Sequence, residues 1–282
     1  MAMVERRAIR ARNTSSDGTL APSELVFRAR IARLSTIAIT DHDTTAGTRA
    51  ARAAARDAGI ELIPGVEISS VDGGRDIHML AYFIDPDAPA LLAFLDAQRG
   101  ERLRRLTAMG DRLASLGCAI DIEPILEHAR CGRSVGRPQV ADALVRGGHA
   151  ADREQAFSKF LEFGAPAFVP RAGATPFDVV RVVHEAGGVV SMAHPGVTRR
   201  DDLIPALAAA GLDALEVRHS DHDEATEARY RALTTELGLA ATAGSDYHGD
   251  SGRRAGMLGA VVMPAGDLDV LRRAAQRRRV DA

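Results

Sequence analysis

The segment Thr40-Asp41-His42-Asp43 closes a short β-branched run, residues 36–40, which predicts a strand. Other clusters that carry imidazole or carboxylate also end or interrupt apolar runs: Pro64-Gly65-Val66-Glu67, His78, Ala193-His194-Pro195 and Gly244-Ser245-Asp246-Tyr247-His248. In a (β/α) barrel, residues at the ends of successive strands converge on one mouth. Because mixed histidine and carboxylate ligands suit divalent metals such as Zn, Mn and Fe, this pattern predicts a metal site at the mouth of a barrel.

Strand and helix patterns alternate on both sides of a long central segment, which favours an α/β fold with a parallel sheet or barrel. The predicted strands cover residues 36–40, 61–70, 76–84, 189–193, 214–217, 239–243 and 259–263. The predicted helices outside the central segment cover residues 22–34, 47–58, 176–186, 203–210, 223–237 and 267–278.

The central segment, residues 89–165, differs from the rest because its leucines recur at helical spacing and no strand alternation interrupts them. Three shorter helical patterns follow the long one, at residues 122–128, 137–146 and 153–161. We therefore expect a barrel formed by residues 1–88 and 166–282, with residues 89–165 inserted as a small helical cap subdomain.

Composition excludes several classes of protein. The net charge of −2 gives no steering toward nucleic acid or an anionic membrane. No apolar run approaches the ~18 residues of a membrane span, and the basic N-terminal dozen residues lack the apolar centre of a signal peptide. The two isolated cysteines fit a reducing compartment, so we expect a cytoplasmic protein. No feature of the sequence indicates a stable protein partner.

Six short motifs occur in a fixed order along nearly the whole chain: Ser16-Asp17-Gly18-Thr19-Leu20, Ile39-Thr40-Asp41-His42-Asp43-Thr44, Pro64-Gly65-Val66-Glu67-Ile68-Ser69, Ile77-His78-Met79-Leu80, Ala193-His194-Pro195-Gly196 and Gly244-Ser245-Asp246-Tyr247-His248. In wording and order they resemble the polymerase and histidinol phosphatase (PHP) family of metal-dependent phosphoesterases. The insertion, with Val135-Gly136-Arg137-Pro138, is similar to that of the branch acting on nucleoside 3′,5′-bisphosphates and short RNA 5′ ends.

The resemblance implies a distorted (β/α)7 TIM-like barrel with a metal cleft of up to three ions. By resemblance, Asp17, His42 and His248 are ligands of one ion, and Glu67, His78 and His194 are ligands of a second. The third position in such proteins uses an N-terminal His-x-His pair together with the counterparts of Glu67 and Asp246, so Asp246 is also a candidate metal ligand. Here that pair is replaced by Arg10 and Arg12. Guanidinium groups are not metal ligands, so we expect two ions rather than three, with Mn, Zn or Fe as the metal.

The expected reaction is hydrolysis of a phosphomonoester of a small nucleotide or a short RNA 5′ end by attack of a metal-bound water. Glu67 and Asp246 are the candidate catalytic carboxylates. Arg10 and Arg12 are counted with them because two guanidinium groups supply about the charge of one divalent ion. The alternative is a catalytically impaired barrel that binds a phosphorylated nucleotide without turnover.

Four further residues are candidates for binding substrate phosphate. His219 and His222 follow a predicted barrel strand and therefore reach the same mouth. Arg137 and Arg171 flank the insertion and could close over a second phosphate. All four are also compatible with an ordinary solvated surface position.

Overall fold

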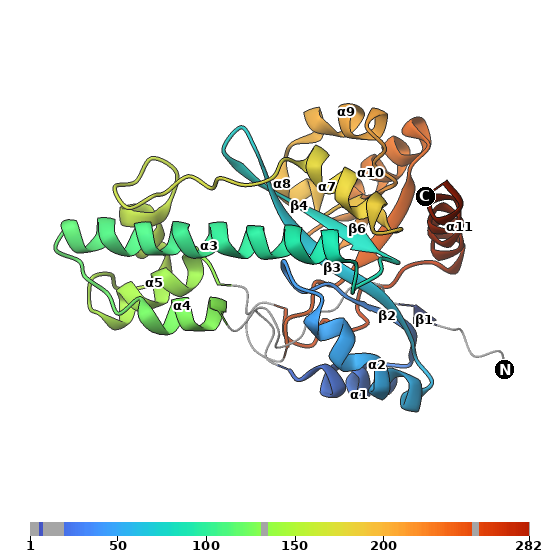
Figure 1. Ribbon diagram of the computed structural model, residues 1–282, viewed down its shortest axis with the longest axis horizontal. Helices are drawn as coiled ribbons and strands as arrows, with labels where there is room; N and C mark the ends of the chain where they lie inside the picture. Colours follow the sequence, from blue (N-terminus) through green and yellow to red (C-terminus); the bar gives the residue numbers. More distant parts are fainter. Residues whose placement is uncertain (1–5, 8–19, 131–134, 250–253, 282) are drawn as a thin grey trace.

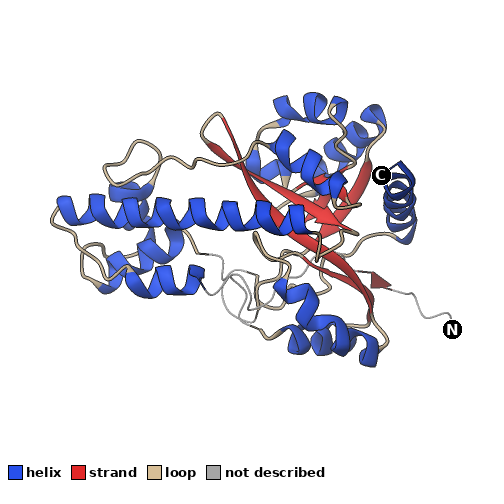
Figure 2. Ribbon diagram, in the orientation of Figure 1, coloured by secondary structure: helices blue, strands red, loops and turns tan. Residues whose placement is uncertain are grey.

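A curled sheet of seven strands, arranged in the order in which they occur along the chain, forms the centre of the molecule (Figure 2). The computed structural model describes residues 6–7, 20–130, 135–249 and 254–281. The strands are β1 (Arg6–Arg7), β2 (Leu34–Ile39), β3 (Glu61–Asp72), β4 (Arg75–Tyr82), β5 (Val189–Met192), β6 (Ala214–His219) and β7 (Ala240–Gly244). The predicted α/β class with a seven-stranded, distorted barrel-like sheet is confirmed.

One strand, β4, runs against its neighbours. β3 and β4 form an antiparallel hairpin and β4 also pairs antiparallel with β5, whereas the other pairs of neighbouring strands are parallel. The N-terminal half of β4 therefore lies beside the C-terminal end of β3, and the C-terminal end of β5 reaches the middle of β4. A side chain near the start of β4 consequently reaches the same mouth as side chains that follow the parallel strands.

Helices surround the sheet (Figure 1). They are α1 (Pro22–Ile31), α2 (Ala46–Ala58), α7 (Pro176–Glu185), α8 (Pro195–Thr198), the 3₁₀ turn η2 (Asp201–Leu203), α9 (Ile204–Ala209), α10 (Glu224–Leu237) and α11 (Ala265–Asp281). Their ends follow sequence rules: Thr175 and Asp178 form a capping box at the start of α7, and Gly59 ends α2 in the left-handed conformation.

Strand alternation divides the core into an inner and an outer side. On β3, Val66 and Ile68 pack in one core with α7. The side chains that point to the inside of the curled sheet form another core. In this core, Leu80 and Tyr82 of β4 pack with Leu268 and Leu271 of α11. Successive side chains of a strand point to opposite faces, so Glu67 and His78 belong to the inner side, nearer the mouth.

One predicted strand is wrong. Residues 258–260 form a turn in which the Ala260 amide donates to the Met257 carbonyl at 3.0 Å, and no strand covers 259–263. Gly259 has φ of 77°, a left-handed conformation that a strand does not use. The apolar run is explained instead by packing, since Met263 lies in the core with α11. The other predicted strands and helices are present with small shifts at their ends.

The insertion consists of helices between β4 and β5 (Figure 1). These are α3 (Pro89–Ser115), α4 (Glu123–Arg130), α5 (Arg137–Arg146), α6 (Arg153–Ala156) and a π-helical turn, η1 (Phe157–Leu161). Leu91 and Leu95 of α3 pack in the core of the barrel, whereas Leu106 and Leu113 belong to a separate core shared with the shorter helices. One helix thus spans both parts, and the division at residues 88/89 stays a prediction.

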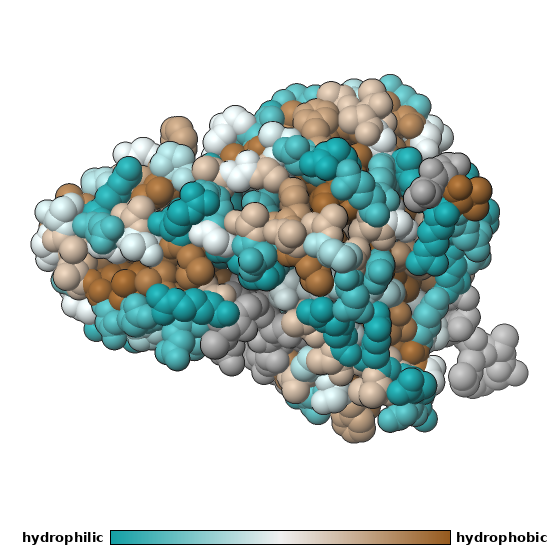
Figure 3. All heavy atoms as spheres, viewed as in Figure 1, coloured by the Kyte–Doolittle hydropathy of each residue, from teal (hydrophilic) through white to brown (hydrophobic). Residues whose placement is uncertain are grey.

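The visible face of the molecule mixes hydrophilic and hydrophobic side chains (Figure 3). Hydrophobic residues gather between α3 and α4, where the partly buried side chains of the second core reach the surface. Among the described residues, no helix combines the length and apolar character that crossing a bilayer requires.

Candidate active site

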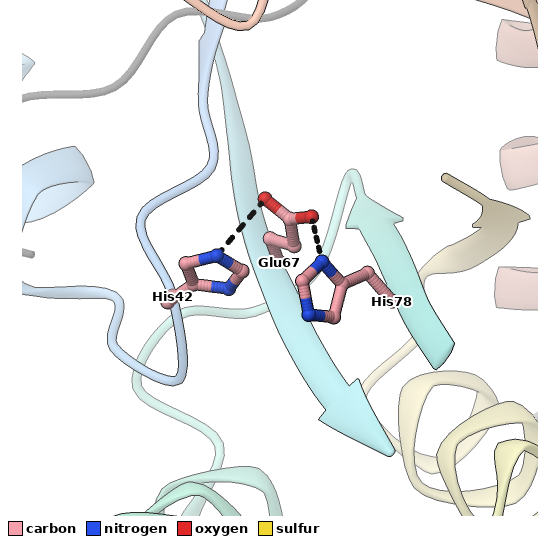
Figure 4. Close-up of side chains that lie close together, drawn as sticks. All are labelled: His42, Glu67 and His78. Atoms are coloured by element: carbon pink, nitrogen blue, oxygen red, sulfur yellow. Dashed lines mark ion pairs between the residues drawn. The ribbon is translucent and has the colours of Figure 1, made fainter. Parts of the chain in front are cut away.

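Glu67 lies at the centre of a group of imidazoles at the mouth of the barrel. Its side chain is fully buried on β3. The chain beyond β2 continues alongside β3: the Glu67 amide donates to the Asp41 carbonyl at 3.1 Å, and the Asp43 amide donates to the Glu67 carbonyl at 2.8 Å. This pairing holds His42 opposite Glu67, with His42 Nε2 at 3.8 Å from Glu67 Oε2 (Figure 4).

His78 reaches Glu67 from β4, as the reversed direction of that strand requires. His78 pairs with Ser69 of β3. Its side chain therefore lies near the C-terminal end of β3, which is the end at the mouth of the barrel. His78 Nδ1 is 3.1 Å from Glu67 Oε1 (Figure 4). The two atoms are close, yet their directions do not meet the geometry of a hydrogen bond.

His194 follows β5 and completes the group. Its Nε2 atom lies 3.4 Å from Glu67 Oε1, and its ring is 5.3 Å from that of His78. The backbone of His194 is left-handed, with φ of 30°, and its amide donates to the buried carboxylate of Glu216 at 2.8 Å. Three of the predicted ligands, His42, His78 and His194, thus surround another predicted ligand, Glu67.

These residues fit a divalent metal ion. The ligand atoms of His42, Glu67 and His78 lie within 4.8 Å of one another. Nitrogen from neutral imidazole and oxygen from carboxylate form the donor set that Zn, Mn and Fe accept. The predicted assignment of His42 to one ion and of His78 and His194 to another is compatible with Glu67 as a ligand shared between them.

A second part of the mouth is formed by the end of β7. Asp246 is buried and left-handed, with φ of 48°, and it forms an ion pair with Arg254. His219, at the end of β6, lies 3.8 Å from Asp246, and His248 Nδ1 lies 4.0 Å from it. His248 therefore approaches the same carboxylate, while Arg254 is a functional candidate that the sequence patterns did not single out.

The two histidines predicted to bind phosphate occupy different environments. His219 is buried, with its ring 5.4 Å from that of His194, so the structure places it beside the metal ligands. His222 is half-buried farther out, where its Nδ1 lies 2.9 Å from the Val217 carbonyl and its Nε2 accepts from the Gly196 amide at 3.2 Å. Burial lowers the pKa of His222, which favours a neutral ring.

Arginines of the insertion and its flanks line a cleft beside the imidazoles. This arginine cleft, about 230 Å³ in volume, is lined on the barrel side by His42, His78 and Asp76 and on the other side by Arg102, Arg105, Arg137 and Arg171. The predicted pair of phosphate ligands, Arg137 and Arg171, is thus brought together next to the candidate metal ligands. The sequence patterns did not single out Arg102 and Arg105. Their spacing of three residues places them on one face of α3, and this was the signal that could have identified them.

The charges in the arginine cleft are unbalanced toward positive. Arg102 forms an ion pair with Asp43, and Arg171 lies 3.5 Å from Asp76. Burial lowers the pKa of Arg105 to about 10, which leaves it charged at neutral pH. Burial raises the pKa of Asp76, but the surrounding positive charges, Arg171 first, outweigh this and hold it below its ordinary value. Four guanidinium groups face two carboxylates, an arrangement that favours a bound anion.

Three predicted site residues, Arg10, Arg12 and Asp17, lie outside the described residues. Their assignment as replacements for a third metal ion, and as a metal ligand in the case of Asp17, stays a prediction.

Comparison with known proteins places this arrangement in a family. The PHP domain model matches residues 11–123. The chain is 34% identical, over 86% of its length and 87% of the relative, to a 3′,5′-nucleoside bisphosphate phosphatase of Chromobacterium violaceum. This chain belongs to the PHP family.

Further proteins are similar to this chain to about the same degree. A 5′-3′ exoribonuclease of Haemophilus influenzae is 33% identical over 87% of this chain and 91% of the relative. A phosphoribosyl 1,2-cyclic phosphate 1,2-diphosphodiesterase of Eggerthella lenta is 35% identical over 86% of this chain and 93% of the relative. A crystal structure from Bifidobacterium adolescentis, described as a metal-dependent phosphoesterase, superposes with a TM-score of 0.82 at 34% identity and covers 95% of this chain and 96% of that one. The chain is accordingly a phosphoesterase of the metal-dependent PHP type.

Proposed function

We propose that this PHP protein removes a phosphoryl group from a small phosphorylated nucleotide, such as a nucleoside 3′,5′-bisphosphate, or acts at a short RNA 5′ end. The observation that carries the proposal is the position of Glu67, whose carboxylate lies within 3.8 Å of the ring nitrogens of three histidines, next to the arginine cleft. Glu67 and the three histidines suit metal ions, and the guanidinium groups of the arginine cleft suit a second phosphate of the substrate. The names of the similar proteins support the same substrate class.

His42, Glu67, His78 and His194 would hold the metal ions, and Asp17 and His248 would complete the set. When bound, a divalent ion lowers the pKa of water and neutralises charge on phosphoryl oxygens. Arg10 and Arg12 would supply positive charge where relatives of this kind hold a third ion, which leaves two ions here. The metal is Mn, Zn or Fe by the chemistry of the ligands.

The protein's own side chains would perform the remaining tasks. Arg102, Arg105, Arg137 and Arg171 would bind and orient the phosphate that is not cleaved, since forked guanidinium donors match phosphate oxygens. Asp246, which forms an ion pair with Arg254, would orient the attacking water and accept its proton. His219 beside Asp246 would donate to the same region of the substrate.

The decisive experiment measures manganese-dependent phosphate release from adenosine 3′,5′-bisphosphate by this protein and by the double variant Arg10→His/Arg12→His. We expect rates that agree within about tenfold, because the arginines replace the charge of the third ion. Glu67→Gln in either background should abolish release and serves as the control for a contaminating phosphatase.

Release by the double variant alone would show that the unaltered chain is catalytically impaired, and would favour the alternative of a barrel that binds a phosphorylated nucleotide without turnover. The same assay tests Asp246: if Asp246→Asn released phosphate at the original rate, Asp246 would not be the proton acceptor.

A further inference from the structure

Two clefts border the candidate metal site, and they differ in chemistry. Asp76, His78, Arg105 and Arg137 line both. The arginine cleft continues toward Arg102 and Arg171, with four guanidinium groups in all. The second, which we call the aromatic cleft, has a volume of about 690 Å³ and continues past His194 to Phe163 and Phe168. Its size lies within the ~300–1,000 Å³ typical of small-molecule sites.

The aromatic cleft contains a phenylalanine that the fold leaves in water. Phe163 is 83% exposed, although Phe160 and Leu161, just before it in the chain, are buried in the core of the insertion. Its ring touches Phe168 edge to face, with centroids 5.4 Å apart and planes at 61°. Packing between the two rings positions Phe163 without covering its faces.

The loop that carries these rings is built by ordered backbone hydrogen bonds. The Ala165 amide donates to the Glu162 carbonyl and the Phe168 amide donates to the Ala165 carbonyl, both at 3.0 Å. Gly164 adopts φ of 84°, which makes the tight turn after Phe163 possible. From η1 the segment returns toward the barrel beside α3 (Figure 1). Phe163 is therefore held at a defined place at the rim of the cleft.

Positive charge lies next to the rings. The Arg137 guanidinium carbon is 5.8 Å from the centroid of Phe168, within the range of a cation–π contact. The same residue lines the arginine cleft, so one side chain borders both clefts. A ligand that spans them needs a negatively charged end and a flat, apolar face.

We infer that the aromatic cleft binds the nucleobase of the substrate by stacking on Phe163 and Phe168, while the arginine cleft binds the phosphate that is not cleaved. Stacking on aromatic side chains accepts any base, because every base has a π-face. Phe163 and Phe168 are thus binding residues that set a preference for nucleotides over other phosphate esters. This inference rests on the proposed function, since it assigns parts of the same substrate to the two clefts.

The test compares adenosine 3′,5′-bisphosphate with the matched abasic compound, ribose 3,5-bisphosphate, as substrates for Phe163→Ala. We expect KM for the adenosine substrate to rise about tenfold, as for the loss of one base–aromatic contact. KM for the abasic compound should not change. Phe163→Tyr should retain the original KM, because it keeps the ring. Phe177→Ala, which removes a half-exposed ring of α7 that lines neither cleft, is the matched control.

A change of the same size for both substrates, or for neither, would overturn the stacking role. Calorimetric binding of adenosine 5′-monophosphate and of ribose 5-phosphate separates this inference from the proposed hydrolysis. If Phe163→Ala loses only the affinity that the adenine contributes, the cleft binds the base even where turnover is not detected. Equal affinity of the unaltered protein for both compounds would overturn the inference while leaving a phosphoesterase activity intact.

Discussion

His194 shows how a single backbone conformation supports the candidate metal centre. Its left-handed φ of 30° is unfavourable for a residue with a Cβ atom and persists only where the surroundings hold it. Two neighbours do so: Pro195 begins α8 with its fixed φ, and the fully buried Glu216 carboxylate accepts the His194 amide at 2.8 Å. Glu216 on β6 is therefore a positioning residue for a ligand that follows β5.

Replacing Glu216 tests this role. Glu216→Ala removes a buried acceptor and should lower the free energy of unfolding by roughly 1–3 kcal/mol. It should also weaken manganese binding about 10- to 100-fold, as loss of an outer-shell partner does. Glu216→Gln, whose amide oxygen still accepts, should recover most of both losses. Urea unfolding and calorimetric metal titration measure the two effects, and unchanged manganese affinity in Glu216→Ala would contradict the assignment.

The contact between β4 and β5 sets the spacing of two candidate ligands, His78 and His194. Gly188 precedes β5 at the point where it meets the end of β4. A Cβ atom on Gly188 would lie 2.5 Å from Ile84 Cγ2 and 2.9 Å from the Tyr82 carbonyl oxygen. Only glycine lets β5 begin this close to β4, and the backbone carbonyl has no freedom to move aside.

We expect Gly188→Ala to destabilise the protein by about 1–3 kcal/mol through overpacking, with reduced phosphoesterase activity because β5 carries His194. Gly266→Ala is a matched control, since nothing lies within 4 Å of an added Cβ there and the residue is in α11. That change should be neutral or stabilise by about 0.5–1 kcal/mol. Thermal unfolding of the two variants makes the comparison; equal melting temperatures would contradict the close approach.

The molecule as a whole consists of a barrel and an insertion that α3 connects. The first half of α3 packs in the barrel core and the second half in the core of the insertion. Arg102 of the same helix pairs with Asp43, directly after His42. Asp43 also accepts the Ser69 amide at 2.8 Å, so the insertion braces the loop that carries a candidate ligand.

Because α3 joins two separate cores, a cavity in one core should increase local unfolding there and leave the other core protected. Leu113→Ala creates a cavity in the core of the insertion and should cost about 2–5 kcal/mol. Hydrogen exchange should then accelerate in α4 and α5, while amides of β3 and β6 keep their protection. Leu116→Ala, at a side chain that is 44% exposed, should leave exchange unchanged. Acceleration throughout the sheet would show one cooperative unit instead.

Much of the fold was predictable because local patterns carry it. Alternation of strands and helices, capping residues such as Thr175 and the leucine periodicity of the central segment all act over short distances in sequence. The strand predicted over 259–263 was wrong because a short apolar run reports burial and not conformation.

Histidines and carboxylates at strand ends were enough to predict the group around Glu67 from sequence. Which of these side chains lie in contact depends on the tertiary structure. The reversal of β4 brings His78 to the mouth, and the packing of α3 brings Arg102 and Arg105 beside it. Strand direction and helix packing depend on contacts between residues far apart in the chain, and spacing along the sequence does not encode these contacts.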